Sequence, residues 1–492
     1  MNSHSTIEQH HLEKGVFKTP LNSIPGMKPM NKYESWFSGR MPEYIWIAII
    51  LDHYRRDEGL RKITYINKFI YQTAPEITLP RLSVLLNLAE EKQRAIYSFI
   101  KHITVNEIFT QLTVVLTHKT APIFSECFYI NHESINTRCE SLLKTINKLR
   151  SQSSVLTNDT RFCVLGYFNL AGKIHVMKEQ GELLVKYQDI QTNSLEYELV
   201  AAMIRNCESI FLMHNENQHP NESYINMFWE CISMMTDCKV FVCDFGESKS
   251  LKQFNQKVYE LLQYLKDLYV NVYPLDKKLE IFTGIITYSC KRLKEVDDHN
   301  LYTSISGRSC IRSLIENYVL AKYLITFETE KPEIWEDFEY YGLGIIKKTV
   351  LAERQNNTRE KESHVPYKYL DILLNEFTME EFTDIDARGY FDQKNIRAKS
   401  ELVDEKDLYK LYYDYDSQYE HCLWGAIRES SMLKCDNSAH QYHLVPDIED
   451  EQQLKTIYYD CIYVMKKMVS FYATQIEIPE KFIKGVTEYK DD

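Results

Sequence analysis

The chain has 492 residues, of which 70 are acidic and 58 basic, and its formal net charge at pH 7 is −12. This length is enough for two or three domains with sizeable hydrophobic cores. The acidic balance disfavours a broad nucleic-acid-binding surface, although a local basic groove is compatible with it. Only 15 glycines and 13 prolines are present, which disfavours an all-β fold with many tight turns and favours helices.

The apolar runs and the cysteines predict where the protein works. The first residues are polar and carry no apolar segment of the kind found in signal peptides. The longest apolar run, Ile45 to Leu51, is far shorter than the roughly 20 residues that a membrane-spanning helix needs. The 12 cysteines are scattered and form no C-x-x-C pair, which is typical of reduced, buried thiols. We therefore expect a cytoplasmic protein with no membrane partner.

The first part of the chain predicts an extended arm followed by a helical domain. Residues 1–30 contain three prolines and little periodicity, as expected of an arm. Pro42 and Glu43 are typical of a helix start, and this helix should run to about Arg56. Apolar periodicity predicts further helices, which together give an N-terminal helical domain over 31–150: 60–72, 80–100, 104–117 and 133–150. The serine-rich stretch 151–160 is the first candidate linker.

Residues 160–272 predict a middle, mainly helical region. Helical patterns recur near 194–206, 221–236 and 250–272. Phe162 to Phe168 and Lys173 to Met177 fit either a short hairpin or a helix that ends at Gly172. Val240 to Asp244 is a short β-like run. A small β element is therefore expected near 160–180 or 240–244.

The C-terminal part predicts a helical bundle over 277–480. Long helices are expected at Leu279–Val296, Ser304–Phe327 and Pro332–Arg354, and the short connections between them favour antiparallel packing. After a polar connection and a helix that starts at Pro366, two further long helices are expected at 404–433 and 450–476. The fold class that follows is mostly α, with a multi-helix N-terminal region and a C-terminal bundle.

One row of charged residues lies inside a run that otherwise has the pattern of a buried helix. Arg308, Arg312 and Glu316 are spaced i, i+4, i+8 and share one helix face. Buried charge is costly unless it is paired. Two interpretations stay open: an ion-pair lattice that rigidifies the bundle, or a pocket for an anionic group such as phosphate, which arginine binds well.

A second row follows later in the chain. Tyr413, Ser417 and His421 repeat the i, i+4, i+8 spacing. His421 has the chemistry of a general acid or base near neutral pH. The alternative is a polar hydrogen-bond network between helices. The chain has no G-x-S-x-G motif, and Ser417 and His421 one turn apart do not form a serine-hydrolase arrangement.

Two other groups of residues are weaker candidates. His440 and His443, with Cys422 and Cys435 upstream, have the ligand types of zinc, but their spacing matches no standard zinc knuckle. A loop histidine pair is the preferred interpretation, so we expect no metal and no cofactor. Trp36, Arg40, Glu43 and Trp46 indicate either an interface or a hydrophobic staple where the arm meets the first helix. The P-loop, G-x-G-x-x-G, H-E-x-x-H and D-F-G motifs are absent from the sequence, which disfavours the enzyme classes that use them.

The two rows together carry a family resemblance. Gly307-Arg308-x3-Arg312-x3-Glu316, followed later by Tyr413-x3-Ser417-x3-His421, resembles uncharacterised bacterial helical domains with an R-x3-E helix and a later Y-x3-S-x3-H helix. These domains look HEPN-like, a class of helical bundles common in toxins and anti-phage systems. The resemblance covers about 280–470 and leaves the first 270 residues unexplained.

The resemblance implies a site assembled across helices. Many HEPN ribonucleases place an arginine and a histidine on one helix in an R-x4–6-H motif, and this chain has no such motif near His421. In a site of this kind Arg308 and Arg312 would hold a phosphate, His421 would move a proton, and Glu316 and Tyr413 would orient them, with Ser417 alongside.

The function expected from this resemblance is a bacterial stress or anti-phage defence effector, acting on RNA or nucleotides as a ribonuclease-type hydrolase. The alternative is a non-catalytic scaffold or sensor that binds a protein partner through its N-terminal half. A small-molecule hydrolase is a third, weaker interpretation. A homodimer is expected by analogy with HEPN-like bundles.

Overall fold

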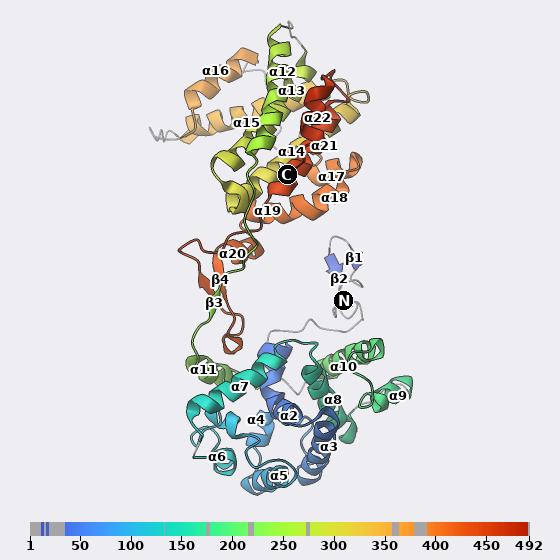
Figure 1. The fold of residues 1–492 in the computed structure, drawn as a ribbon, viewed down its shortest axis with the longest axis vertical. Coiled ribbons are helices and arrows are strands. Elements are labelled where there is room, and N and C mark those ends of the chain that lie inside the picture. The colour runs from blue at the N-terminus through green and yellow to red at the C-terminus, as the bar shows by residue number, and fades with distance from the viewer. Residues whose placement is uncertain are drawn as a thin grey trace. The chain divides into compact units, whose positions relative to one another are not determined.

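The computed structural model describes residues 11–13, 16–18, 35–131, 133–173, 178–214, 221–271, 276–356, 364–377 and 391–490. The fold is mostly α, as the sequence predicts (Figure 1). The chain divides into two compact units. Unit 1 consists of Met1–Phe241 and Lys434–His443, and unit 2 consists of Val242–Leu433 and Leu444–Asp492. Among the described residues, no helix has the length and apolar character required to cross a bilayer.

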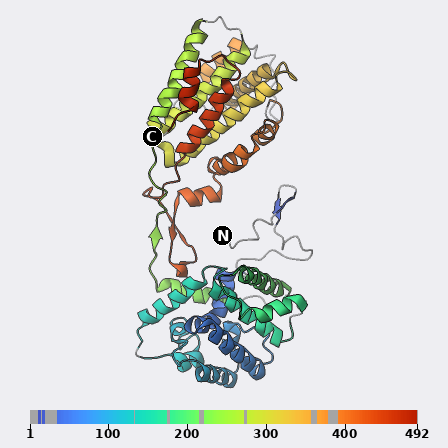
Figure 2. The same cartoon turned by 45° about the vertical axis from the view of Figure 1, so that its right-hand side comes forward.

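Unit 1 is built around α2 (Met41–His53), whose residues from Met41 to Leu51 are all buried. A helix that is apolar on every side must be covered on every side, and α2 contacts α3, α4, α7 and α8. The two views place it among these helices (Figures 1 and 2). A short π-helix, η2 (Trp36–Arg40), leads into it. The other helices of the unit are α3 (Arg56–Thr73), α4 (Leu82–Leu86), α5 (Glu90–Ile103), α6 (Pro122–Phe128), α7 (Ile135–Leu149), α8 (Val155–Leu170), α9 (Lys178–Lys186), α10 (Leu195–His214) and α11 (Glu222–Met234).

Two details of unit 1 differ from the expected elements. The stretch 104–117 forms only the short 3-10 helix η3 (Thr110–Val114). Phe162–Phe168 lies within α8, so the hairpin interpretation is wrong there and the helix interpretation is confirmed. Gly172 ends this helix with a φ of +65°, the left-handed conformation that glycine adopts without strain. Residues 174–177, the rest of the expected hairpin, lie outside the described residues.

The strands are short. In the arm, β1 (His11–Glu13) pairs antiparallel with β2 (Val16–Lys18), and the rest of residues 1–30 lies outside the described residues. The second sheet has the order β3-β4-β5, formed by β3 (Val240–Phe241), β4 (Met432–Cys435) and β5 (Leu444–Pro446). β3 confirms the β element expected near 240–244. It pairs antiparallel with β4 in a register that sets Val240 opposite Cys435.

Unit 2 is a bundle around α14 (Ile305–Phe327), which contacts α13, α15, α17, α19 and α21. The three long helices expected before residue 356 are confirmed as α13 (Lys277–Asp298), α14 and α15 (Ile334–Asn356). The remaining helices are α12 (Lys252–Asn271), η4 (Leu301–Thr303), α16 (Tyr367–Phe377), α17 (Ile396–Leu402), α18 (Lys406–Leu408), η6 (Tyr409–Tyr413), α19 (Asp414–Glu420), α20 (Trp424–Ser430), η7 (Ser438–His440, in unit 1), α21 (Tyr458–Tyr472) and α22 (Glu480–Thr487). Residues 357–363, within the expected polar connection, lie outside the described residues.

The predicted extent of the last two long helices, 404–433 and 450–476, is wrong. The stretch 404–433 is broken after α19, because Cys422 takes a positive φ of 49° and turns the chain into α20. The stretch 450–457 is not helical, because its backbone bonds to η4 instead of to itself. Leu454 N donates to Thr303 O at 2.9 Å, and Ile457 N donates to Tyr302 O at 3.1 Å. Only α21 forms in this segment.

Gly307 is required where η4 approaches the first turn of α14. A Cβ atom at this position would lie 2.0 Å from the carbonyl oxygen of Leu301. Gly307→Ala should therefore lower the free energy of unfolding of unit 2 by about 1–3 kcal/mol, the usual cost of overpacking. Chemical denaturation followed by circular dichroism measures it.

Gly284, in the middle of α13, is the matched control, because nothing lies within 4 Å of the Cβ it would gain. Gly284→Ala should stabilise the helix by about 0.5–1 kcal/mol. Equal effects of the two substitutions would contradict the close approach of η4 to Gly307.

Candidate functional site

The charged row on α14 meets the polar row on α19, although the two are far apart in the sequence. Ser304 caps α14 by accepting a hydrogen bond from Gly307 N at 3.0 Å, which fixes where the helix begins and which way its faces point. The face that carries Arg308, Arg312 and Glu316 then lies against η6 and α19, both of which contact α14. The expected juxtaposition of the two rows is therefore present for most of their members.

Arg312 is the centre of this polar network. Its Nε donates to Ser417 Oγ at 3.1 Å, and its Nη2 donates to Tyr413 Oη at 2.6 Å. Its Nη1 lies 3.5 Å from Glu316 Oε2, one helix turn away. The guanidinium carbon also lies 4.6 Å from the centroid of the Tyr413 ring. All three nitrogens of Arg312 are thus engaged by side chains of the same unit, while the side chain stays 22% exposed.

Tyr413 and Ser417 close the network. Tyr413 Oη donates to Glu316 Oε2 at 3.2 Å, and Ser417 Oγ donates to the Tyr413 carbonyl at 2.6 Å. Tyr413 is the last residue of the π-helix η6, a distortion often found at functional sites. Burial, followed by the charge of Glu316, raises the pKa of Tyr413, so its hydroxyl stays protonated and acts as a donor.

His421 does not join the network. It is the residue that ends α19, its side chain is exposed, and its backbone N donates to Ser417 O at 3.1 Å. No hydrogen bond or ion pair links its ring to another described side chain. The cause is the end of the helix at Glu420, which takes His421 off the face shared by Tyr413 and Ser417.

Arg308 makes a separate cluster one turn earlier on α14. It is 6% exposed, and its Nη2 donates to the Lys455 carbonyl at 2.6 Å. Its neighbours include Asp416, a residue that sequence reasoning missed, which is 4% exposed. Burial raises the pKa of Asp416 to about 7, although Arg308 opposes the shift, and the charge of Asp460 adds to it. No sequence signal separates Asp416 from the exposed Asp414 on the same helix.

The polar lattice continues along α14 beyond the predicted residues. Glu405 is 6% exposed and accepts hydrogen bonds from Tyr318 Oη at 2.7 Å and Lys322 Nζ at 2.8 Å. Lys467 Nζ lies 2.9 Å from its other oxygen. Burial opposes this ionisation, but the hydrogen bonds from Lys322 and its neighbours hold the pKa of Glu405 below its ordinary value. α14 thus presents paired charge along much of its length.

Comparison with known proteins gives one result for this region. Residues 279–440 match DUF5677, a family of unknown function. No curated protein and no solved structure matches the chain. The DUF5677 segment contains both polar rows, so the network around Arg312 lies entirely within it. It ends at His440 and leaves most of unit 1 outside.

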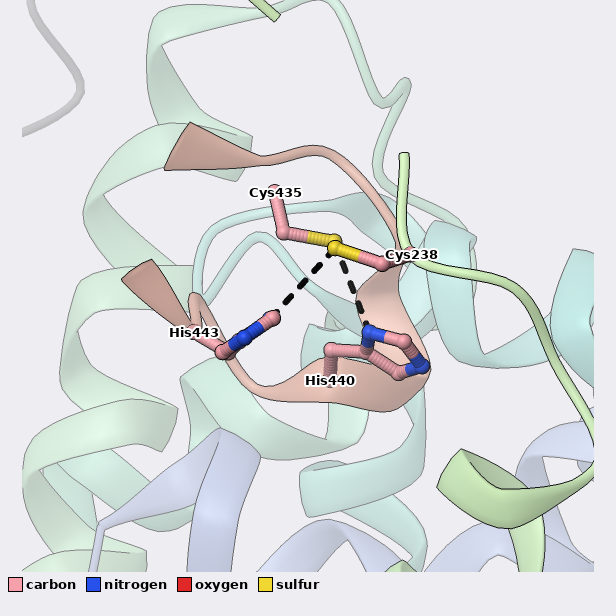
Figure 3. A group of neighbouring side chains, drawn as sticks. All are labelled: Cys238, Cys435, His440 and His443. Atoms are coloured by element: carbon pink, nitrogen blue, oxygen red, sulfur yellow. Dashed lines mark hydrogen bonds between the residues drawn. The ribbon is translucent and has the colours of Figure 1, made fainter. Parts of the chain in front are cut away.

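The histidine pair near the end of the DUF5677 segment has a neighbour that sequence reasoning missed. His440 and His443 lie with Cys435, as the sequence suggested, but the fourth member of the group is Cys238 and not Cys422 (Figure 3). The side-chain ligand atoms of these four residues all lie within 4.8 Å of one another. Cys238 is remote in sequence, and only the pairing of β3 with β4 brings it to Cys435.

The aromatic group near the start of α2 is not an interface. Trp36 and Trp46 are both 1% exposed, and their ring nitrogens donate to Leu149 O and Pro80 O at 2.9 Å. Arg40 pairs with Glu208, and Glu43 accepts hydrogen bonds from Ser83. The interface interpretation is wrong, because these side chains are buried in the core of unit 1.

The raised pKa of Asp416 gives a pH dependence with a definite sign. The folded chain keeps this proton up to about pH 7, whereas the unfolded chain releases it near its ordinary pKa of 3.8. The folded state is therefore penalised as pH rises from about 4 to about 7, by on the order of 2–4 kcal/mol. Asp416→Asn should remove this penalty, so the variant should gain stability over the wild type at about pH 8 and gain roughly a third as much at about pH 5.

Urea unfolding of the two proteins at both pH values measures the effect. Asp414→Asn, at an exposed position of the same helix, is the control and should show no such pH-dependent gain. A loss of stability in Asp416→Asn that is equal at both pH values would contradict the shifted pKa.

Proposed function

We propose that the protein is a non-catalytic helical scaffold or sensor that binds a protein partner through its N-terminal half, in the bacterial cytoplasm. The observation that supports this most is the closed network of Arg312. Each of its three nitrogens already contacts Ser417, Tyr413 or Glu316, so a substrate phosphate would have to compete with partners inside the chain. A catalytic histidine also needs a partner that orients it, and the His421 ring has none among the described residues.

An apolar surface of unit 1 supports a protein partner. Leu195 and Leu199 lie one turn apart on α10 and are 71% and 65% exposed. Val185 on α9, which contacts α10, is 79% exposed. Neighbouring apolar side chains that are exposed to this degree, such as Leu195 and Leu199, are typical of surfaces that another protein covers. The N-terminal half thus supplies the surface for binding, while the polar lattice of unit 2 holds its helices together.

Site-specific crosslinking tests the partner. A photoreactive amino acid at Leu195 should give a discrete protein adduct in cells, and Leu199→Glu in the same chain should remove it, because a charge on this surface opposes docking. The same photoreactive residue at Tyr65, which is 58% exposed on α3, is the matched control and should give no such adduct. A second copy of this chain as the adduct would identify a homodimer. No adduct from Leu195, or equal adducts from both positions, would contradict the docking surface.

A second function is favoured by the meeting of the two rows. It is a stress or anti-phage defence effector with a HEPN-like domain that acts on RNA or nucleotides. Arg312 and Glu316 are 22% and 23% exposed, so the network is within reach of solvent. Asp416 beside Arg308, with a pKa of about 7, offers a proton-transfer group that does not depend on His421.

Activity measurements decide between the two functions. For a scaffold, purified wild type should leave bacterial RNA intact, and induced expression of wild type, His421→Ala and Asp416→Asn should affect growth equally. Arg312→Ala should lower stability by about 1–3 kcal/mol, because Glu316 and Tyr413 lose their partner. RNA cleavage or toxicity in the wild type that is lost in folded His421→Ala or Asp416→Asn would overturn the scaffold and establish the effector.

A further inference from the structure

Four side chains of unit 1 converge with the ligand types and the spacing of a tetrahedral metal site. Cys238, Cys435, His440 and His443 all have a ligand atom within 4.8 Å of the other three. Cys435 Sγ lies 3.5 Å from His440 Nδ1, and Cys238 Sγ lies 3.8 Å from His443 Nδ1. With Zn–S near 2.3 Å and Zn–N near 2.0–2.1 Å, a tetrahedral site has a sulfur–nitrogen separation of roughly 3.6 Å. The two sulfur–nitrogen distances, 3.5 and 3.8 Å, are near this separation, and Figure 3 shows the four side chains converging.

We propose that these four residues bind one Zn²⁺ ion in a structural site. Two thiolates and two neutral imidazoles in a tetrahedral arrangement favour zinc over the oxygen-preferring cations. Four protein ligands leave no open coordination position for a water or a substrate, so the site serves stability and not catalysis. The site is separate from the network of Arg312, which lies in unit 2, and none of its ligands belongs to the apolar surface of α9 and α10.

The pairing of β3 with β4 holds the two cysteines. The strands set Val240 opposite Cys435, and Asp436 N donates to Lys239 O at 2.8 Å, which extends the pairing toward Cys238. Lys239 N also lies 3.3 Å from Cys435 Sγ and donates to it. A backbone N–H that donates to a cysteine sulfur orients it, as outer hydrogen bonds do for metal ligands.

The loop between β4 and β5 carries the two histidines and has a strained backbone. Gln441 and Tyr442 are consecutive non-glycine residues with positive φ, 51° and 63°. Each such residue costs energy and persists only where its surroundings demand it, often at functional sites. Here the turn brings His443 back to the cluster. His443 N donates to His440 O at 2.9 Å, and Cys435 N donates to His443 O at 3.1 Å.

The surroundings of His440 fix its tautomer for metal binding. Its Nε2 lies 3.1 Å from the Thr236 carbonyl and 3.3 Å from the Ser233 carbonyl, at the end of α11. A carbonyl oxygen only accepts, so Nε2 carries the hydrogen. Nδ1 is then the unprotonated nitrogen, and it points toward Cys435 Sγ. Metal-bound histidines are usually oriented in this way by a backbone carbonyl.

Metal content of the full-length protein, purified under reducing conditions without chelators, tests the proposal first. The wild type should contain one zinc ion per chain, and Cys238→Ser and His443→Gln should lose it. Both positions are exposed, so their loss of metal is separable from a collapse of the core. Cys422→Ser and His118→Gln, at an exposed cysteine and an exposed histidine elsewhere, are the matched controls and should keep the metal.

Cobalt substitution gives a readout that folding alone does not move. Co²⁺ in place of zinc should produce the visible spectrum of a tetrahedral site with thiolate charge-transfer bands. His443→Cys should keep one Co²⁺ ion with stronger charge-transfer bands, because three thiolates then replace two. Chelation should lower the melting temperature of the wild type and leave Cys238→Ser unchanged.

Three results would overturn the proposal. These are a reduced, folded wild type that binds neither Zn²⁺ nor Co²⁺, a loss of metal in Cys422→Ser as large as in Cys238→Ser, and a Cys238–Cys435 disulfide in protein purified under reducing conditions.

Discussion

The position of two arginines on the packed face of α14, Arg308 buried and Arg312 half-buried, is the constraint on which unit 2 depends. A guanidinium cannot lose its proton in a protein, so an arginine inside a bundle must find partners or cost several kcal/mol. Arg312 finds them on η6 and α19, and Arg308 finds the Lys455 carbonyl. Two later stretches of the chain must therefore return to the same helix. The extended segment before α21, which carries this carbonyl, is held there by its backbone bonds to η4.

The sequence predicts elements well where the signal is local. α7, α13 and α14 each combine one apolar face with a capping side chain, Ser134, Asp276 or Ser304, and their ranges came out close to the expected ones. The same periodicity misled at 450–457, where the backbone finds partners in η4, and at 404–433, where Cys422 reverses the chain. In the first stretch a tertiary contact outweighs the helical pattern of the sequence, and in the second a single left-handed residue does so.

The same distinction explains which site residues were found. Arg312, Glu316, Tyr413 and Ser417 were predicted because a helix converts their spacing into a shared face. His421 carried the same spacing, but its helix ends one residue too early. Asp416 and Cys238 were not predicted, because each has its partners far from it in the sequence. Burial gives Asp416 its raised pKa, and a two-residue strand brings Cys238 to Cys435.

The two polar centres differ in how their charges balance. Around Arg312 donors face acceptors: the guanidinium and the Tyr413 hydroxyl donate, and Ser417, Tyr413 and Glu316 accept. In the cluster of Cys238, Cys435, His440 and His443, sulfurs and imidazole lone pairs converge, and all of them are electron donors. Such groups gain from a cation between them, whereas in the first group opposite charges already face each other. This contrast is why one centre supports a scaffold and the other supports a metal.

Unit 1 is completed by a segment, Lys434–His443, that follows the larger part of unit 2, Val242–Leu433, in the chain. His443 is synthesised 205 residues after Cys238. At ordinary translation rates this interval lasts on the order of 10–40 s. During that time Phe37 and Arg150 lack the packing of Tyr442. In the folded protein the centroid of the Tyr442 ring lies 5.5 Å from that of Phe37 and 4.5 Å from the guanidinium carbon of Arg150. The nascent N-terminal unit therefore stays incomplete until Lys434–His443 has been synthesised, long after the rest of its residues.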